Sequence, residues 1–100
     1  MDALTRENFD LVINNDKNIL IYIYKDNDPK SMLGLDPIEQ LDRMYAKDFS
    51  IYILNSDTQP EAASALDSRI VPELVFIKNS RIIYRSTEQL YTNQILDHLR

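Results

Sequence analysis

Cysteine and histidine, two side chains that commonly act in catalysis, are scarce in this sequence. The 100 residues include no cysteine and a single histidine, His98. Without cysteine there is no thiolate nucleophile, no disulfide and no thiolate zinc site. Hydroxyl side chains such as Ser31 and Thr87 have no histidine near them in sequence to act as a general base. We therefore expect no catalytic residue, and we interpret His98 as a solvated histidine stabilised at the end of a helix.

The run Asp26-Asn27-Asp28 is a cluster of groups that could ligate a hard cation. It contains two carboxylates but lacks the further spaced oxygen ligands that calcium and magnesium sites use. Short runs of aspartate and asparagine are typical of turns, where their side chains bond to nearby backbone. The sequence therefore predicts no metal site, and no motif in it indicates a cofactor.

Composition is typical of one globular domain spanning residues 1–100. Hydrophobic residues make up 44% of the chain and charged residues 27%, and this length suits a single core. A formal net charge of −5, with no run of lysine or arginine, disfavours direct nucleic-acid binding. The apolar runs are too short to cross a membrane, and the start of the chain lacks a signal-peptide pattern. The cytoplasm is therefore the default expectation.

Hydrophobic periodicity predicts alternating helices and strands. Strands are expected at residues 19–24, 50–54, 73–78 and 81–86. Helices are expected from Thr5 to about residue 15, from Asp36, from Thr58 to about Leu66, and from Thr92 to Leu99. Asp36 would cap the second helix with Pro37 at its first position, and residues 31–35 would form at most an earlier turn.

The connections between these elements predict an α/β fold. Helical crossovers after the first two strands imply parallel strands with helices on the sheet faces. The two-residue turn Asn79-Ser80 implies a closing hairpin, which adds an antiparallel edge. Tyr22 and Tyr24 alternate with isoleucines in the first strand, so both rings are expected on one face of the sheet.

Several segments, in order along almost the whole chain, resemble thioredoxin-like domains. Leu4-Thr5 with Phe9-Asp10 resembles the family's opening helix, and Pro29 stands where the family has its active-site proline. Ile70-Val71-Pro72 resembles the loop that carries the family's cis-proline. The resemblance implies a three-layer α/β sandwich with a four-stranded mixed sheet and helices on both faces. Met1 to Ala3 would add at most a short fifth strand.

The departures from that family concern its redox chemistry. Asn27 and Lys30 stand where the family has its two catalytic cysteines. Ile21 and Ile53 stand at the positions we assign to the family's buried aspartate and its lysine partner. The resemblance therefore implies a redox-inactive member that is not an enzyme.

The leading functional hypothesis is a protein-binding adaptor or assembly factor. In this family the cis-proline leaves the backbone of the preceding residue free to pair with an extended chain, so Val71 retains that capacity and Val71-Pro72 is expected to be cis. The composition is also compatible with a phage-encoded protein that binds a host protein. The partner-binding rim would consist of Tyr24, Asp26, Asn27, Asp28, Pro29, Lys30, Val71 and Pro72.

Two alternatives remain open at this point. The chain could be a structural subunit or homodimer assembled through a sheet edge formed by Ile51, Tyr52, Ile53 and Leu54. That edge would be either covered by Met1 to Ala3 or open to another strand. The second, weaker alternative is a small-molecule site in the family's glutathione-binding region, where Lys30 and Arg69 supply the cationic groups.

Overall fold

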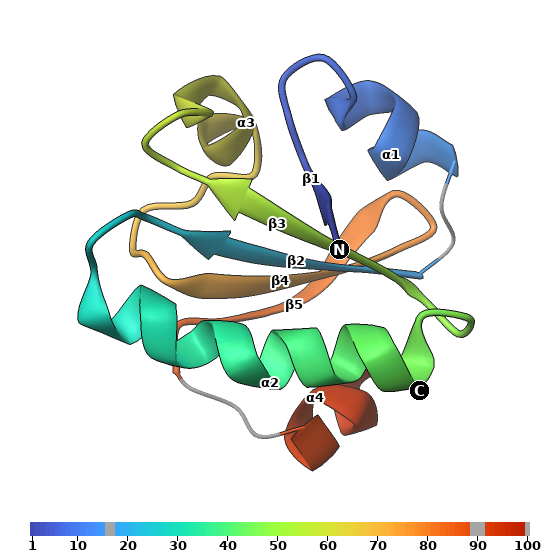
Figure 1. Ribbon diagram of the computed structural model, residues 1–100. Coiled ribbons are helices and arrows are strands. Elements are labelled where there is room, and N and C mark those ends of the chain that lie inside the picture. Colours follow the sequence, from blue (N-terminus) through green and yellow to red (C-terminus); the bar gives the residue numbers. More distant parts are fainter. Residues whose placement is uncertain (16–17, 89–91, 100) are drawn as a thin grey trace.

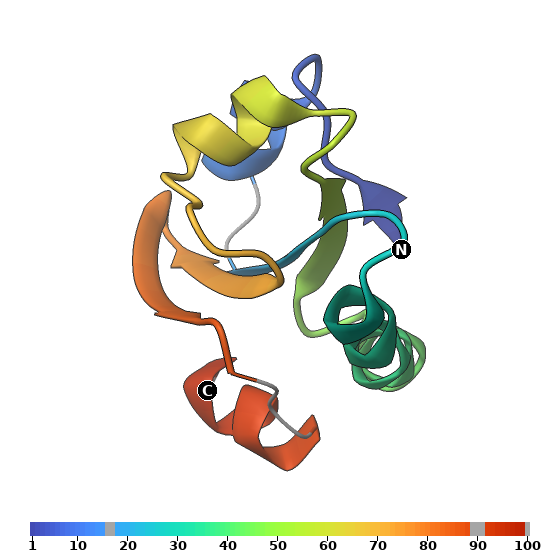
Figure 2. The same cartoon turned by 90° about the vertical axis from the view of Figure 1, so that its left-hand side faces the viewer.

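The computed structural model describes residues 1–15, 18–88 and 92–99 and has three layers, with a mixed sheet between two layers of helices (Figure 1). The sheet order is β1-β3-β2-β4-β5. Helices α1 and α3 cover one face of the sheet, and α2 and α4 cover the other (Figures 1 and 2). The elements in chain order are β1 (Asp2–Ala3), α1 (Phe9–Asn15), β2 (Asn18–Tyr24), α2 (Pro29–Tyr45), β3 (Ser50–Asn55), α3 (Pro60–Ala65), β4 (Glu73–Lys78), β5 (Arg81–Ser86) and α4 (Thr92–Leu99).

The central strand β2 supplies both hydrophobic cores. Ile19, Ile21 and Ile23 pack in the core under α1 and α3. Leu20 and Tyr22 pack in the core under α2 and α4. Because both faces are covered, every position of the strand's interior is apolar, as a continuous run predicts.

Strand β4 runs in a direction that the crossover pattern did not predict. It pairs antiparallel with β2, with Val75 opposite Ile21, whereas β3 is parallel to β2. Strand β4 starts at the end of the sheet at which β3 finishes, because Glu73 lies opposite Ile23 and Asn55 lies opposite Tyr24. The six-residue α3 spans about 9 Å, less than the length of about 20 Å of a six-residue strand, and does not carry the chain across the sheet. The expectation of parallel strands here is therefore wrong.

The outer edge of β3 is covered by the start of the chain. In β1, Asp2 and Ala3 pair in parallel with Tyr52 and Ile53. The backbone N–H of Leu4 then donates to the Ile53 carbonyl at 2.7 Å. Of the two alternatives for the edge along Ile51, Tyr52, Ile53 and Leu54, the short N-terminal cover is the one that the structure has. An assembly that requires this edge to be open is thus not supported.

Helix α2 begins eight residues earlier than expected. Asp28 is its N-cap, and the carboxylate accepts from the Ser31 backbone N–H at 3.0 Å and from the Ser31 hydroxyl at 2.8 Å. Pro29 occupies the first helical turn, and Pro37 lies inside the helix. The Asp-Pro signature that suggested a start at Asp36 occurs twice, and the earlier copy begins the helix. Pro37 costs one intrahelical hydrogen bond because proline has no N–H.

Two other local features agree with expectation in part. Thr5 acts as a cap, because its hydroxyl accepts from the Asn8 N–H at 3.3 Å and its own N–H donates to the Asn8 side chain at 2.7 Å, but the regular helix begins only at Phe9. His98 is half-buried rather than simply solvated. Its ring stacks on Tyr84 with centroids 3.8 Å apart, so it belongs to an aromatic cluster.

The closing hairpin forms as expected. Asn79 and Ser80 both have positive φ, at 52° and 65°. A two-residue hairpin turn of this kind requires such angles at both positions, and asparagine tolerates them well. The Ser80 hydroxyl also donates to the Ile13 carbonyl at 3.0 Å, which ties the turn to α1.

The single glycine of the chain makes room for a tyrosine. The hydroxyl of Tyr22 in β2 donates to the carbonyl of Ser31 in α2 at 2.8 Å. The Tyr22 ring lies directly against Gly34, which is also in α2. A β-carbon at position 34 would overlap the Tyr22 hydroxyl oxygen and lie 2.7 Å from its Cζ. Glycine is therefore required in α2 by this close approach rather than by its backbone conformation.

We expect Gly34→Ala to destabilise the protein by about 1 to 3 kcal/mol, because the added methyl overpacks the contact with Tyr22. At a solvent-exposed position inside a helix, the same substitution would stabilise a protein by up to about 1 kcal/mol. Denaturant unfolding measures the effect. The control is Gly34→Ala in a Tyr22→Leu background, where we expect it to be neutral or stabilising. An equal loss in both backgrounds would refute the steric explanation.

Candidate functional site

The loop after β2 is held in place by the loop after β3. The Asp26 carboxylate accepts from the Asn55 side-chain amide at 3.1 Å, and the Asp26 N–H donates to the Asp57 carboxylate at 3.2 Å. Asn27 is exposed and has a φ of 56°, in the left-handed region that asparagine tolerates better than most residues. The residues at this loop thus shape a turn and carry no nucleophile.

Asp28 has a structural role as the cap of α2. The Ser31 hydroxyl and N–H hold the pKa of the Asp28 carboxyl below its usual range, and Lys25 and Lys30 contribute in the same direction. The Asp28 carboxylate is therefore bonded to the N-terminal turn of α2, where it acts as the N-cap. Among the residues described, no group of three or more aspartate, glutamate or histidine side chains is arranged to hold a metal ion.

Tyr24 lies at the edge of the core. Its half-buried ring stacks on Tyr22, with the centroids 6.3 Å apart and the planes 6° from parallel. Both rings lie on the face expected from their alternation with isoleucine. The Tyr24 carbonyl accepts from the Ser56 N–H at 2.8 Å and from its hydroxyl at 3.1 Å.

The Val71-Pro72 peptide bond is cis, as expected. Strand β4 begins just after it, at Glu73. Within the described part of the chain, neither the N–H nor the carbonyl of Val71 has a hydrogen-bond partner. Next to it, Ile70 is a large apolar side chain that is 65% exposed. This loop therefore presents unpaired backbone groups beside an exposed apolar residue.

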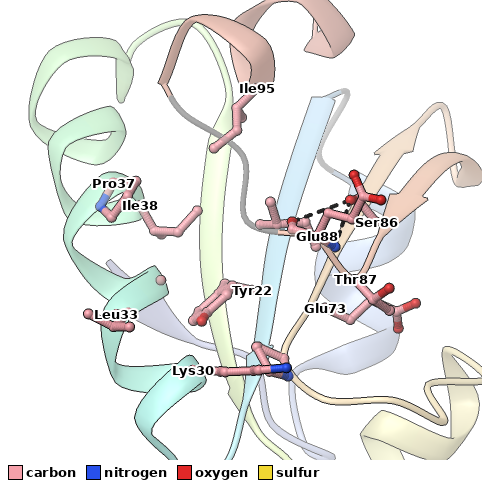
Figure 3. A pocket seen from close by; sticks show the side chains of 13 residues that line it. Tyr22, Lys30, Leu33, Pro37, Ile38, Glu73, Ser86, Thr87, Glu88 and Ile95 are labelled. Carbon is pink, nitrogen blue, oxygen red and sulfur yellow. Dashed lines mark hydrogen bonds between the residues drawn. The ribbon is translucent and has the colours of Figure 1, made fainter.

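A groove of about 540 Å³ opens beside this loop, between α2, the end of β5 and α4 (Figure 3). Tyr22 lies at its floor, Leu33 and Pro37 line the wall formed by α2, and Ile95 closes it from α4. The described residues that line it are Tyr22, Lys30, Leu33, Gly34, Pro37, Ile38, Pro72, Glu73, Leu74, Ser86, Thr87, Glu88 and Ile95.

The polar groups of the groove differ in availability. The Glu73 carboxylate, although buried, is paired with the Arg85 guanidinium through two hydrogen bonds of 2.9 Å. Arg85 also donates to the Leu66 carbonyl at 2.8 Å, and Glu73 raises the pKa of this guanidinium. Lys30 and Glu88, at the mouth, are exposed and form no ion pair with any described residue. Among the described residues, the groove is therefore apolar inside, with Lys30 and Glu88 as unpaired charges at its rim.

The structure brings together only part of the rim expected from sequence. Lys30 and Pro72 line the groove, and Val71 adjoins it. Tyr24, Asp26, Asn27, Asp28 and Pro29 do not line it, because they form the core edge, the fixed turn and the helix cap. Arg69, expected at a small-molecule site, pairs with Asp67 on the surface at 3.2 Å. The sequence did not predict the other described lining residues as part of a site: Tyr22, Leu33, Gly34, Pro37, Ile38, Glu73, Leu74, Ser86, Thr87, Glu88 and Ile95.

Comparison with known proteins identifies the fold. No protein-family profile and no curated protein sequence matches the chain. Its structure is similar to that of a point mutant of thioredoxin from Halobacterium salinarum NRC-1, with a TM-score of 0.86 and 18% sequence identity. The match covers 99% of this chain and 86% of that one. The chain has the thioredoxin fold. It is a thioredoxin fold without any cysteine, and none of its described helices is long and apolar enough to cross a membrane.

One detail assigned from the thioredoxin resemblance is not supported. Ile21 packs in the core under α1 and α3, whereas Ile53 packs against the core under α2 and α4. Two positions on opposite faces of the sheet do not form a side-chain pair. The residue beside Ile21 in register, on the same face, is Tyr52.

We expect the pKa of Asp28 to lie clearly below the usual range for aspartate, and Ser31→Ala to raise it because the hydroxyl donor is lost. A carboxyl titration followed by ¹³C NMR measures both values. Since the folded-state pKa is lowered, the stabilisation from this carboxylate is fully present above the ordinary aspartate pKa. It is lost as the pH falls from there through the lower pKa of the folded state. Ser64→Ala, a change at an exposed position of α3, is the control. An unchanged Asp28 titration in Ser31→Ala would refute the assigned cause.

We expect no disulfide-reductase activity above the dithiothreitol background in an insulin-reduction assay, because the chain has no thiolate. The double variant Asn27→Cys with Lys30→Cys should gain at most weak activity. Its first cysteine would occupy a left-handed backbone position, and Ile21 behind it has no ionisable group. The matched double serine variant controls for folding. Activity near that of a thioredoxin in the cysteine variant would contradict this interpretation.

Proposed function

We propose that this thioredoxin-fold protein binds an extended segment of another protein without catalysing a reaction. The observation that carries the proposal is the pairing of two features at one place, the unpartnered backbone of Val71 and the apolar groove that begins at Pro72. Extended peptides bind folded domains by main-chain hydrogen bonds, with pockets for their side chains. Both parts of that recognition mode are available here.

The groove sets the chemistry of the bound side chain. Its volume of about 540 Å³ lies within the usual range for ligand sites, and Tyr22, Leu33 and Ile95 give it an apolar interior. A large aliphatic or aromatic side chain of the partner would lose its contact with water there. The opposite charges of Lys30 and Glu88 at the mouth favour neither an acidic nor a basic peptide strongly.

The residues around the groove support binding rather than chemistry. Ser86 and Thr87 offer hydroxyls, but Ser86 is engaged with the backbone of Glu88, whose N–H donates to it at 3.1 Å. His98 stacks against Tyr84 and is not among the groove residues. A non-catalytic role as an adaptor or assembly factor, including a phage-encoded one, uses only the features that the site provides.

The test compares two leucines of equal exposure. Leu33 on α2 is 64% exposed and lines the groove, whereas Leu11 on α1 is 66% exposed and lies on the opposite face of the sheet. Peptides are selected against the wild-type protein from a random library displayed on phage, and their affinities are measured by fluorescence anisotropy. We expect Leu33→Asp to weaken binding about tenfold or more, because it places a charge in the apolar wall, and Leu11→Asp to leave binding unchanged.

Amide exchange locates the bound peptide. The Val71 N–H should exchange quickly in the free protein and slowly in the complex, because the peptide supplies its missing acceptor. Equal weakening by Leu33→Asp and Leu11→Asp, or selected peptides that leave Val71 unprotected, would reject this groove as the binding site.

A further inference from the structure

The second feature that suggests a partner is the free edge of the sheet at β5. This strand is last in the sheet order, opposite the edge covered by β1 (Figure 2). Three consecutive apolar side chains along it are exposed, with Ile82 at 45%, Ile83 at 50% and Tyr84 at 38%. An edge strand carries backbone N–H and carbonyl groups that point away from the sheet, so another strand can pair with it.

The charges at the hairpin end of this edge have one sign. Lys78 and Arg81 lie directly opposite each other across the hairpin, and neither forms an ion pair with a described residue. Like charges in directly opposed positions of a β-pair are destabilising. The other arginine of the strand, Arg85, is already neutralised by Glu73. A chain with a net charge of −5 thus carries, at the exposed end of its β4–β5 hairpin, two basic side chains that no described residue neutralises.

The register of β5 leaves one residue out of the ladder. Phe76 pairs with Tyr84 and Ile77 with Ile82, so Ile83 forms a bulge with no partner in β4. Bulges and terminal charges commonly protect sheet edges from unwanted pairing. Here the protecting charges have a single sign, so they repel a strand that carries basic residues at this end of β5. They attract an acidic strand.

We propose that the outer edge of β5 is a docking site for an extended, acidic segment of a partner protein. The segment adds a strand to the sheet, places apolar side chains against Ile82, Ile83 and Tyr84, and neutralises Lys78 and Arg81 with carboxylates. This surface is separate from the groove, and its use does not depend on the groove being occupied.

The test uses two synthetic strand-forming peptides that differ only in charge. The acidic probe is acetyl-Glu-Val-Thr-Val-Thr-Val-Glu-amide, and the basic probe has lysine in place of both glutamates. Binding to the full chain is followed by ¹⁵N NMR, which also identifies the amides that change. We expect the acidic peptide to shift and protect the amides of Arg81–Ser86, and to bind about tenfold more tightly than the basic one.

A charge reversal makes the assignment specific. The variant Lys78→Glu with Arg81→Glu should bind the basic peptide in preference to the acidic one. The matched control, Arg43→Glu with Lys47→Glu, changes the net charge equally but alters exposed positions in the last turn of α2 and just after that helix. It should keep the wild-type preference.

Three results would overturn the proposal. The first is binding of the acidic peptide that shifts the Val71 and Leu33 amides instead of β5, which would support the groove while rejecting the edge. The second is an equal loss of preference in the control variant, which would reduce the effect to net charge. The third is a dimer of the unbound chain with protected β5 amides, which would mean that a second copy occupies the edge.

Discussion

Ser31 is the residue on which the arrangement of the site depends. It is a fully buried polar residue, and every one of its polar groups is used. Its N–H and hydroxyl donate to Asp28 at 3.0 and 2.8 Å, its hydroxyl accepts from the Lys25 N–H at 3.2 Å, and its carbonyl accepts from the Tyr22 hydroxyl at 2.8 Å. Leaving such buried groups unpaired would cost about 1 to 3 kcal/mol each, so the first turn of α2 is fixed to the end of β2.

This fixed turn supports the proposed binding role, which needs no thiol chemistry. The loop in the place of the reactive cysteines forms a helix cap. Asp28 accepts the hydrogen bonds of this cap, and the Tyr22 hydroxyl bonds to the carbonyl of Ser31 in the same turn. The same contacts hold α2 at a distance at which Tyr22 becomes the floor of the groove and Leu33 part of its wall. Burial, with a contribution from the nearby Asp28 charge, raises the pKa of Tyr22 to about 12, so its hydroxyl remains a donor throughout the physiological range.

Sequence patterns were sufficient wherever a short stretch of residues determines the structure. The apolar run of β2 predicted a strand buried on both faces, and Asn79-Ser80 predicted the hairpin. Sequence patterns were insufficient where contacts between distant residues favour one of two similar local signals. The Asp-Pro pairs at Asp28 and Asp36 are alike as helix starts, and the contact of Ser31 with Tyr22, together with the bonds from Ser31 to Asp28, favours the first. The groove was missed for the same reason, because its walls come from β2, α2, β5 and α4. The single glycine, Gly34, was the one local signal of a close approach at this place.

Backbone amide exchange in the free protein tests the central claim most directly. If the turn at Ser31 is a fixed support and the loop before β4 a preformed binding surface, the Ser31 amide should be strongly protected and the Val71 amide should exchange almost as fast as in an unstructured peptide. A rapidly exchanging Ser31 amide would mean that the cap and the groove wall are not preformed. A protected Val71 amide would mean that its backbone already has a partner, and either result would contradict this account.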